Sequence, residues 1–233
     1  MRHTYVRAEL LPTVLSVIAG SADVIGFLGL GGLFTAHITG NLAMVAAHLV
    51  VGESASLALL LSVPMFIVGL GITRVLAAGL DRAQRPSLPP LLLLQFLLLA
   101  GFALLCIAVG PRPDPNAPGA VVAGMLGVCA LAVQNALVQI SLPGVPPTAV
   151  LTTNMTRFTI DLVEIVVGRN PDEVLAARRR AKRTWPVVAG FTAGAALGAW
   201  GFAAAGLRAL VMPAGLGLLA VILGLQPHVE HGA

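Results

Sequence analysis

Two short stretches of the sequence resemble each other and set the expected architecture. Residues 35–41 are Thr-Ala-His-Ile-Thr-Gly-Asn, and residues 148–154 are Thr-Ala-Val-Leu-Thr-Thr-Asn. They align without a gap at an offset of 113 residues, and four of the seven positions are identical. Each stretch follows a long apolar run and precedes a shorter helical stretch and two further long runs. This shared order predicts a duplicated unit, with repeats over about residues 10–110 and 120–226.

The composition indicates a polypeptide that lies in a lipid bilayer. Of the 233 residues, 57% are hydrophobic and 10% are charged, and the mean hydropathy is +0.92. A soluble domain of this size carries about a quarter charged residues. The net charge of +4 comes from basic residues in the linkers between apolar runs, not from a basic stripe. We therefore expect a single membrane domain over residues 1–233 and no nucleic-acid partner.

Six apolar runs are long enough to cross a hydrocarbon core about 30 Å thick as helices. Gly206-Leu207-Arg208 predicts a tight turn between the last two runs, and glycines spaced by four at 190, 194 and 198 predict close helix packing. The six runs are Leu10–Leu30, Leu57–Ala78, Leu88–Val109, Val121–Leu142, Pro186–Ala205 and Ala209–Leu225.

The segments that contain the repeated heptads are too short to cross. Helices over Asn41–Gly52 and Asn154–Gly168 would be about 18 Å and about 22 Å long. The preceding residues are rich in threonine, which favours extended backbone. We predict a short extended segment followed by a half-helix in each repeat, with Thr39 or Asn41 and Thr153 or Asn154 as N-caps.

The basic residues favour six crossings with two re-entrant half-helices. That topology places the N-terminus, residues 74–85 and residues 169–183 in the cytoplasm and leaves Arg112 and Arg208 outside. The expected fold class is therefore an all-α integral membrane protein with both termini cytoplasmic. Because each repeat crosses three times, the second repeat is expected to be inverted relative to the first.

Polar residues beside the half-helices form the candidate binding site. Asp23, deep in the first run, is costly there without a partner, so it either bonds a neighbouring helix or couples proton movement. His37 is either a structural donor or a proton carrier, and Gln134 with Asn135 occupies the corresponding point of the second repeat. Their hydroxyl, amide and backbone N–H groups suit a polar or anionic small molecule. The predicted substrate-binding residues are Asp23, Thr35, His37, Thr39, Asn41, Asn135, Thr152, Thr153 and Asn154.

Charged residues in the second half suggest two further roles. Arg157, Asp161 and Glu164 lie on one stripe of the second half-helix, which forms either a proton path or an anchor for the helix end. His48 is the positional equivalent of Asp161. The basic run Arg178–Arg183, followed by Trp185, predicts contact with anionic lipid. No metal cluster, cofactor motif or catalytic set is recognised, so we expect no metal, no cofactor and no enzymatic activity.

The sequence resembles the YoaK-like family of bacterial inner-membrane proteins over nearly its whole length. The resemblance rests on Gly20-x-x-Asp23-x-x-Gly26-Phe27, on Gly32-Leu33-Phe34-x-Ala36-His37-Ile38-Thr39-Gly40-Asn41, and on Gln134-Asn135-Ala136 with Thr152-Thr153-x-x-Thr156. Asn154 with Arg157 departs from it, since family members often have a Thr-Gly pair and an apolar helix there. The resemblance implies a bacterial inner-membrane location and no established activity.

Two functions are compatible with these patterns. The extended segment with its half-helix is similar in architecture to the binding element of sulfate-permease and nucleobase-permease type transporters. The first hypothesis is therefore a small secondary transporter that holds its substrate between two facing half-helix N-termini near the membrane midplane. The alternative is a non-transporting membrane scaffold or accessory subunit. Six crossings are few for a transporter, so the first hypothesis includes a homodimer.

Overall fold

The computed structural model describes residues 2–52, 54–111 and 113–225, with side chains from Leu10 onward. Across these ranges the chain is helical and contains no strand, which confirms the all-α prediction. The elements are α1 (Arg2–Gly29), α2 (Ile38–Val51), α3 (Leu57–Arg82), α4 (Leu88–Val109), α5 (Pro118–Ser141), α6 (Leu151–Val167), α7 (Pro171–Ala205), the 3₁₀ turn η1 (Gly206–Leu210) and α8 (Val211–Gly224).

Five helical stretches in the described ranges are long and apolar enough to cross a membrane. Four are the apolar part of α1, then α3, α4 and α5, and the fifth is the continuous stretch Pro171–Gly224. The structure differs from the prediction of six separate crossing helices only at this last stretch. There the chain turns at Gly206, whose φ of +59° suits glycine, and continues into the 14 residues of α8. These helices indicate a membrane protein.

The two short helices begin earlier than the sequence predicted. α2 starts at Ile38 and α6 at Leu151, three residues before the predicted starts at Asn41 and Asn154. The prediction of side-chain N-caps is therefore wrong, because neither helix has a side-chain cap. Both asparagines instead lie inside the first turns, and their side chains reach back to the preceding segment.

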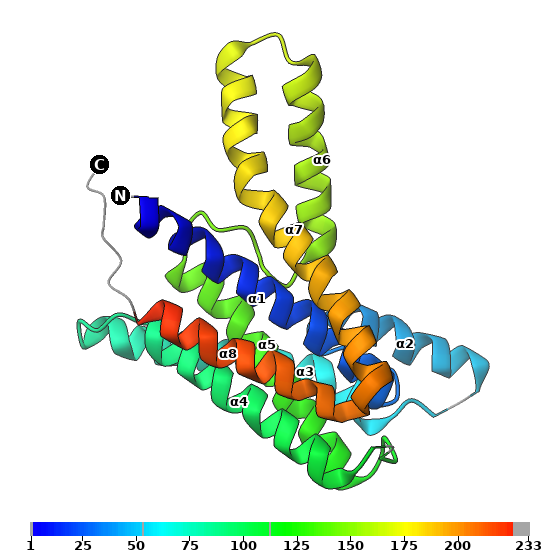
Figure 1. Cartoon of the computed structure of the whole chain (residues 1–233). Helices are drawn as coiled ribbons and strands as arrows, with labels where there is room; N and C mark the ends of the chain where they lie inside the picture. The colour runs from blue at the N-terminus through cyan, green and yellow to red at the C-terminus, as the bar shows by residue number, and fades with distance from the viewer. Residues whose placement is uncertain (1, 53, 112, 226–233) are drawn as a thin grey trace.

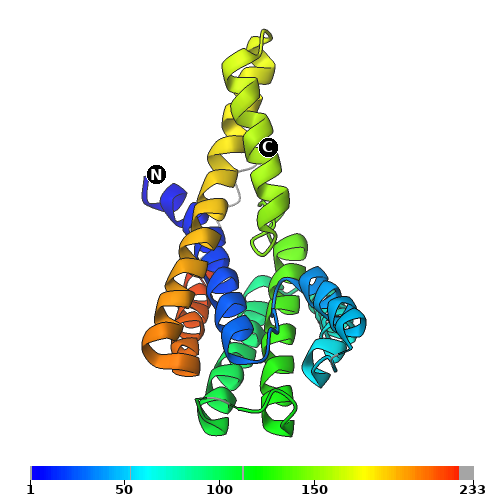
Figure 2. The ribbon, with the colours of Figure 1, turned by 90° about the vertical axis from the view of Figure 1, so that its right-hand side faces the viewer.

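The long helices pack in two corresponding pairs. α1 lies against α7, and α5 lies against α3 (Figures 1 and 2). The predicted glycine stripe is confirmed: Gly190, Gly194 and Gly198 of α7 face successive turns of α1 around Thr13, Val17 and Ser21. The absence of side chains there lets the two backbones approach closely.

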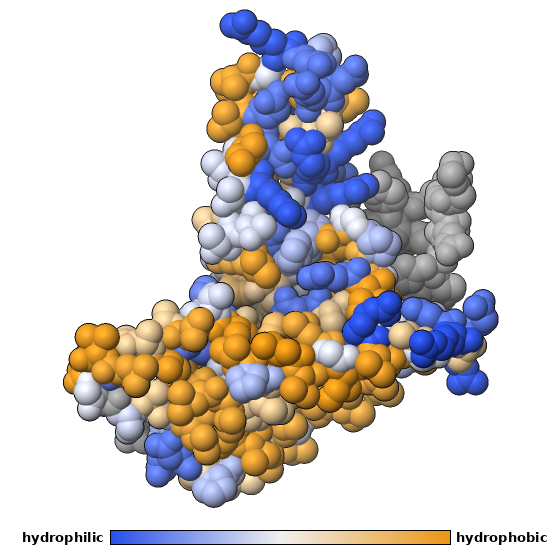
Figure 3. All heavy atoms as spheres, turned by 180° about the vertical axis from the view of Figure 1, so that it is seen from behind, coloured by the Kyte–Doolittle hydropathy of each residue, from blue (hydrophilic) through white to orange (hydrophobic). Residues whose placement is uncertain are grey.

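A helical hairpin projects from this body. It consists of α6 and the first half of α7, which run side by side away from the other helices (Figures 1 and 2). α7 has 35 residues and is about 52 Å long, well beyond a hydrocarbon core of about 30 Å. Seen from behind, the body surface is mostly hydrophobic, whereas much of the hairpin is hydrophilic (Figure 3). The polarity therefore changes where the hairpin leaves the body.

The glycine stripe gives a stability prediction. A Cβ at Gly194 would clash with the carbonyl oxygen of Val17, which forces α1 and α7 apart. We expect Gly194→Ala to lower the free energy of unfolding by roughly 1–3 kcal/mol. Gly71→Ala in α3 is the matched control, since no atom lies within 4 Å of its Cβ position. Thermal unfolding in detergent measures both, and equal stability of the two variants would contradict the packing described here.

Candidate functional site

Asp23 holds the segment that precedes α2. The residue lies in α1 and is 4% exposed. Its Oδ1 accepts the backbone N–H groups of Ala36 at 2.6 Å and His37 at 3.3 Å, and the hydroxyl of Thr35 lies 3.5 Å away. Non-helical backbone buried in an apolar environment needs such partners. The structure therefore places Asp23, Thr35 and the backbone of His37 together, and Asp23 fixes the segment to α1.

Asn41 closes the same segment from the other side. Its Nδ2 donates to the carbonyl oxygen of Phe34 at 2.7 Å, and its Oδ1 accepts the N–H of Phe34 at 2.8 Å. Asn41 is fully buried, and both the nitrogen and the oxygen of its side-chain amide are bonded to Phe34. The Phe34 ring also stacks on Phe27, with 4.5 Å between ring centroids. Residues 34–37 are thus fixed by backbone bonds at both ends.

Gln134 plays the corresponding part in the second half. It lies in α5, and its Nε2 donates to the hydroxyl of Thr148 at 2.9 Å and to the carbonyl oxygen of Leu15 at 2.8 Å. Its Oε1 accepts Nε2 of Gln95 in α4 at 2.7 Å. Gln95, Gln134 and Thr148 are all buried. The amide therefore links α1, α4 and α5 to the segment that precedes α6.

Gln95 is the site residue that the sequence analysis missed. It is the single hydrogen-bonding side chain among the residues of α4, the most apolar long helix. An isolated polar residue in an apolar run is costly unless it is paired. That isolation is the signal that could have identified it beforehand.

Asn154 makes only one of the two side-chain hydrogen bonds that Asn41 makes. Its Nδ2 donates to the carbonyl oxygen of Pro147, and the spacing of seven residues is the same as that between Asn41 and Phe34. Proline has no N–H group. The Oδ1 of Asn154 accordingly has no hydrogen-bond donor among the described residues, although the side chain is buried.

The two pinned segments contact the same central helix. The methyl group of Thr35 lies at Gly127 of α5, where an added Cβ would be 2.9 Å from it. Thr148 bonds Gln134, which is seven residues further along α5. Seven residues of helix correspond to about 10 Å. The segments before α2 and α6 thus contact the same helix at points about 10 Å apart along its axis.

The remaining predicted site residues are less constrained. His37, Thr39, Thr152 and Thr153 have exposed positions at the starts of the two short helices. Asn135 is half-buried, and its Nδ2 donates to the carbonyl oxygen of Leu131 in its own helix.

The ionic stripe of α6 bonds the hairpin together. Oδ1 of Asp161 accepts from Nη2 of Arg180 at 2.6 Å and from Nε at 2.8 Å. The side chain of Asp161 is 5% exposed, whereas that of Arg180 is 58% exposed. Through Asp161 the stripe is bonded to α7, and the proton path and the anchor both stay predictions. His48, its positional equivalent, bonds the carbonyl oxygen of Met44 through Nδ1.

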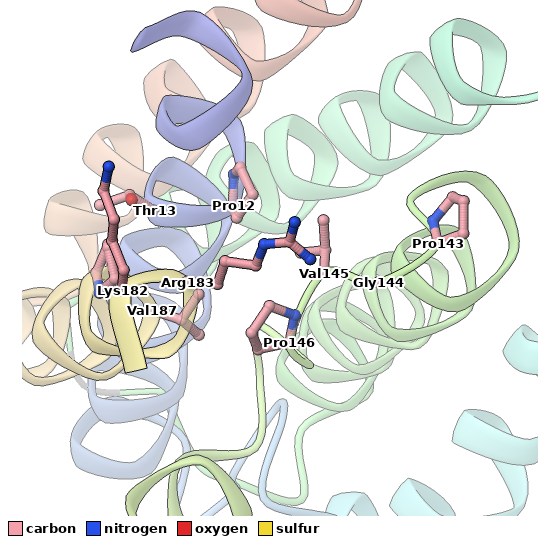
Figure 4. Close-up of a pocket in the computed structure, with 10 residues that line it drawn as sticks. Pro12, Thr13, Pro143, Gly144, Val145, Pro146, Lys182, Arg183 and Val187 are labelled. Atoms are coloured by element: carbon pink, nitrogen blue, oxygen red, sulfur yellow. The ribbon is translucent and has the colours of Figure 1, made fainter. Parts of the chain in front are cut away.

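Two surface hollows lie where the hairpin joins the body. Figure 4 shows the first, between α1, the link 143–146 and α7, with the Arg183 side chain reaching from α7 toward Val145 and the Lys182 side chain beside Thr13. The second lies across the same link and is lined by Arg157, Asp161 and Arg180. Neither hollow is lined by the polar residues that fix the starts of α2 and α6.

The unequal exposure of the ion pair predicts an unequal cost of breaking it. Arg180→Ala leaves a buried carboxylate without its cation, whereas Asp161→Ala leaves an arginine that reaches water. We expect Arg180→Ala to destabilise the hairpin more than Asp161→Ala, by roughly 1–3 kcal/mol. Hydrogen exchange of the α6 amides measures the difference, and equal exchange in the two variants would contradict it.

Comparison with known proteins agrees with the expectation of an uncharacterised family. No curated protein and no solved structure matches the chain. The family model described as "Protein of unknown function (DUF1275)" matches residues 11–223. Because this match covers most of the sequence, the chain belongs to the DUF1275 family.

Proposed function

We propose that the protein is a small secondary transporter of a polar small molecule in a bacterial inner membrane. It crosses the bilayer six times as two inverted repeats, each with one re-entrant half-helix, and both termini are cytoplasmic. The observation that carries this proposal is the attachment of two non-helical segments, one from each half, to the same central helix about 10 Å apart.

The helix packing supports inversion of the repeats. α4 and α8 are the last helices of the two halves, and they pack antiparallel: Gly217 faces Phe96 and Leu99, while Gly224 faces Leu92. The first helix of each half also packs on the third helix of the other half, as α1 on α7 and α5 on α3. Such an exchange is expected when two units are related by a two-fold axis in the membrane plane.

The buried hydrogen bonds support re-entry. After α1 ends at Gly29, the chain returns to bond Asp23, six residues back, or about 9 Å along the helix axis. After α5 ends at Ser141, the chain returns to bond Gln134, seven residues back. α2 and α6 then start within the body and lead outward. Non-helical backbone at membrane depth is tolerated where it is buried in protein or lines a cavity.

The substrate site in this proposal lies between the first turns of α2 and α6. Helix N-termini carry free N–H groups and a positive dipole end, and in this proposal the predicted residues from Asp23 to Asn154 bind the substrate beside them. Asp23 supplies the coupling proton. Its charge strengthens the bonds to the N–H groups of Ala36 and His37, so protonation loosens the segment that precedes α2.

The basic residues support cytoplasmic access at the hairpin. The hollows beside link 143–146 lie next to the segment that leads to Pro147 and Thr148, and Arg183 lines both of them. The arginines and the lysine of Arg178–Arg183 are exposed. In this proposal they contact anionic lipid headgroups at the cytoplasmic surface.

Asp23→Asn tests proton coupling. The amide oxygen can still accept from residues 36 and 37, so the variant is expected to fold but to lose solute-driven proton movement. Proteoliposomes loaded with a pH-sensitive dye are challenged with a panel of carboxamides, carboxylates and inorganic anions. Asp81→Asn is the matched control, since Asp81 is exposed on α3.

Two outcomes of this proton-movement assay would count against the prediction. Wild-type protein and Asp81→Asn are expected to move protons with at least one solute. Equal proton movement in Asp23→Asn would remove Asp23 from the coupling site. Absence of any movement with the wild-type protein would instead favour the scaffold alternative.

A further inference from the structure

The two halves differ at one hydrogen bond. In the first half, Asn41 donates to and accepts from the backbone of Phe34. In the second half, Pro147 stands at the equivalent position and can only accept. The Oδ1 of Asn154 is therefore an unused acceptor in a residue that is 1% exposed.

A second unused acceptor belongs to the same network. Among the described residues, the buried side-chain atoms without a hydrogen-bond partner are Oδ1 of Asn154 and Oε1 of Gln95. Gln95 bonds Gln134, Gln134 bonds Thr148, and Asn154 bonds the adjacent Pro147. Both unused atoms are amide oxygens of side chains that belong to the hydrogen-bond network around residues 147–148. Buried acceptors without donors are rare, and each calls for an explanation.

We propose that the second half binds the transported molecule directly, and that this molecule donates an N–H or O–H hydrogen bond to Oδ1 of Asn154. The inference rests on the transport function proposed above and narrows its substrate class. A fully deprotonated anion offers acceptors only, so its oxygens would face another oxygen at this position. A neutral molecule with an amide or hydroxyl donor satisfies the Asn154 side chain.

The surroundings of Asn154 suit such a molecule. Thr152 and Thr153 lie in the same first turn of α6 with exposed side chains, and their hydroxyl groups can donate or accept. The first half offers no comparable acceptor at Asn41, because the amide oxygen and nitrogen of that side chain are already bonded to Phe34. The first half thus has no unused acceptor at Asn41, whereas the second half has one at Asn154.

Pro147→Ala tests the inference because it adds the missing N–H group. The alanine can donate to Oδ1 of Asn154 as Phe34 donates to Asn41, which closes the pair and occupies the acceptor. We expect this variant to fold with an equal or higher melting temperature and to lose ligand binding. Pro146→Ala is the matched control, since it changes the neighbouring proline without adding a donor at position 147. Asn154→Leu removes the acceptor and is expected to lose ligand binding as well.

Pairs of small molecules that differ in having or lacking an N–H donor test whether the ligand must donate to Asn154. Melting temperatures of the detergent-solubilised protein are measured with benzamide against benzoate and with acetamide against acetate. We expect the amides to stabilise the wild-type protein and Pro146→Ala. Pro147→Ala should need about tenfold or more amide for the same shift, because a filled acceptor excludes the ligand donor. The carboxylates should give no shift.

Three results would overturn the inference. One is an amide response in Pro147→Ala that equals the wild-type response. Another is stabilisation by carboxylates alone, which leaves the transport proposal intact if the dye assay is positive. The third is a higher melting temperature of Pro147→Ala while no amide stabilises the wild-type protein, which would make the open acceptor a purely structural defect. If the dye assay is also negative for all solutes, the transport proposal fails as well.

Discussion

The architecture depends on hydrogen-bonding the non-helical backbone that returns into the apolar body. Without water, each unpaired N–H or C=O group there costs several kcal/mol. Asp23 meets this need for the backbone before α2, while Gln134 fixes the segment before α6 through the Thr148 hydroxyl. Each comes from the first helix of its half. Because these bonds join residues 13 or 14 positions apart, they define where the chain turns back and where each short helix begins.

The two halves use the same plan with different chemistry. The first segment is held by a carboxylate and by the closed Asn41–Phe34 pair. The second is held by neutral amides and a hydroxyl, with two amide oxygens left open. α7 also extends beyond the body, and its Arg180 holds Asp161 of α6. The second half therefore differs from the first in having two buried amide oxygens without a hydrogen-bond donor among the described residues.

The sequence predicted much of the framework because its signals are local. Apolar runs gave the helices, and the spacing of Gly190, Gly194 and Gly198 gave the contact with α1. The helix starts were predicted three residues too late, because asparagine is a common N-cap residue. The side chains of Asn41 and Asn154 instead bond residues seven positions back. The bonds from Gln95 to Gln134 and from Arg180 to Asp161 join different helices. Such pairings follow from tertiary packing, which no local pattern encodes.

Labelling of single cysteines from outside the membrane tests the topology most directly, in a background where Cys106 and Cys129 are replaced. In the six-crossing topology Ser54, Asp114 and Arg208 lie outside and Gln84 and Arg169 lie in the cytoplasm, and all five positions are exposed. Cysteines at the first three positions should react with an impermeant maleimide in intact cells, and those at the last two only after permeabilisation. Labelling of position 54 only after permeabilisation, with position 84 reactive in intact cells, would contradict the re-entrant, inverted arrangement.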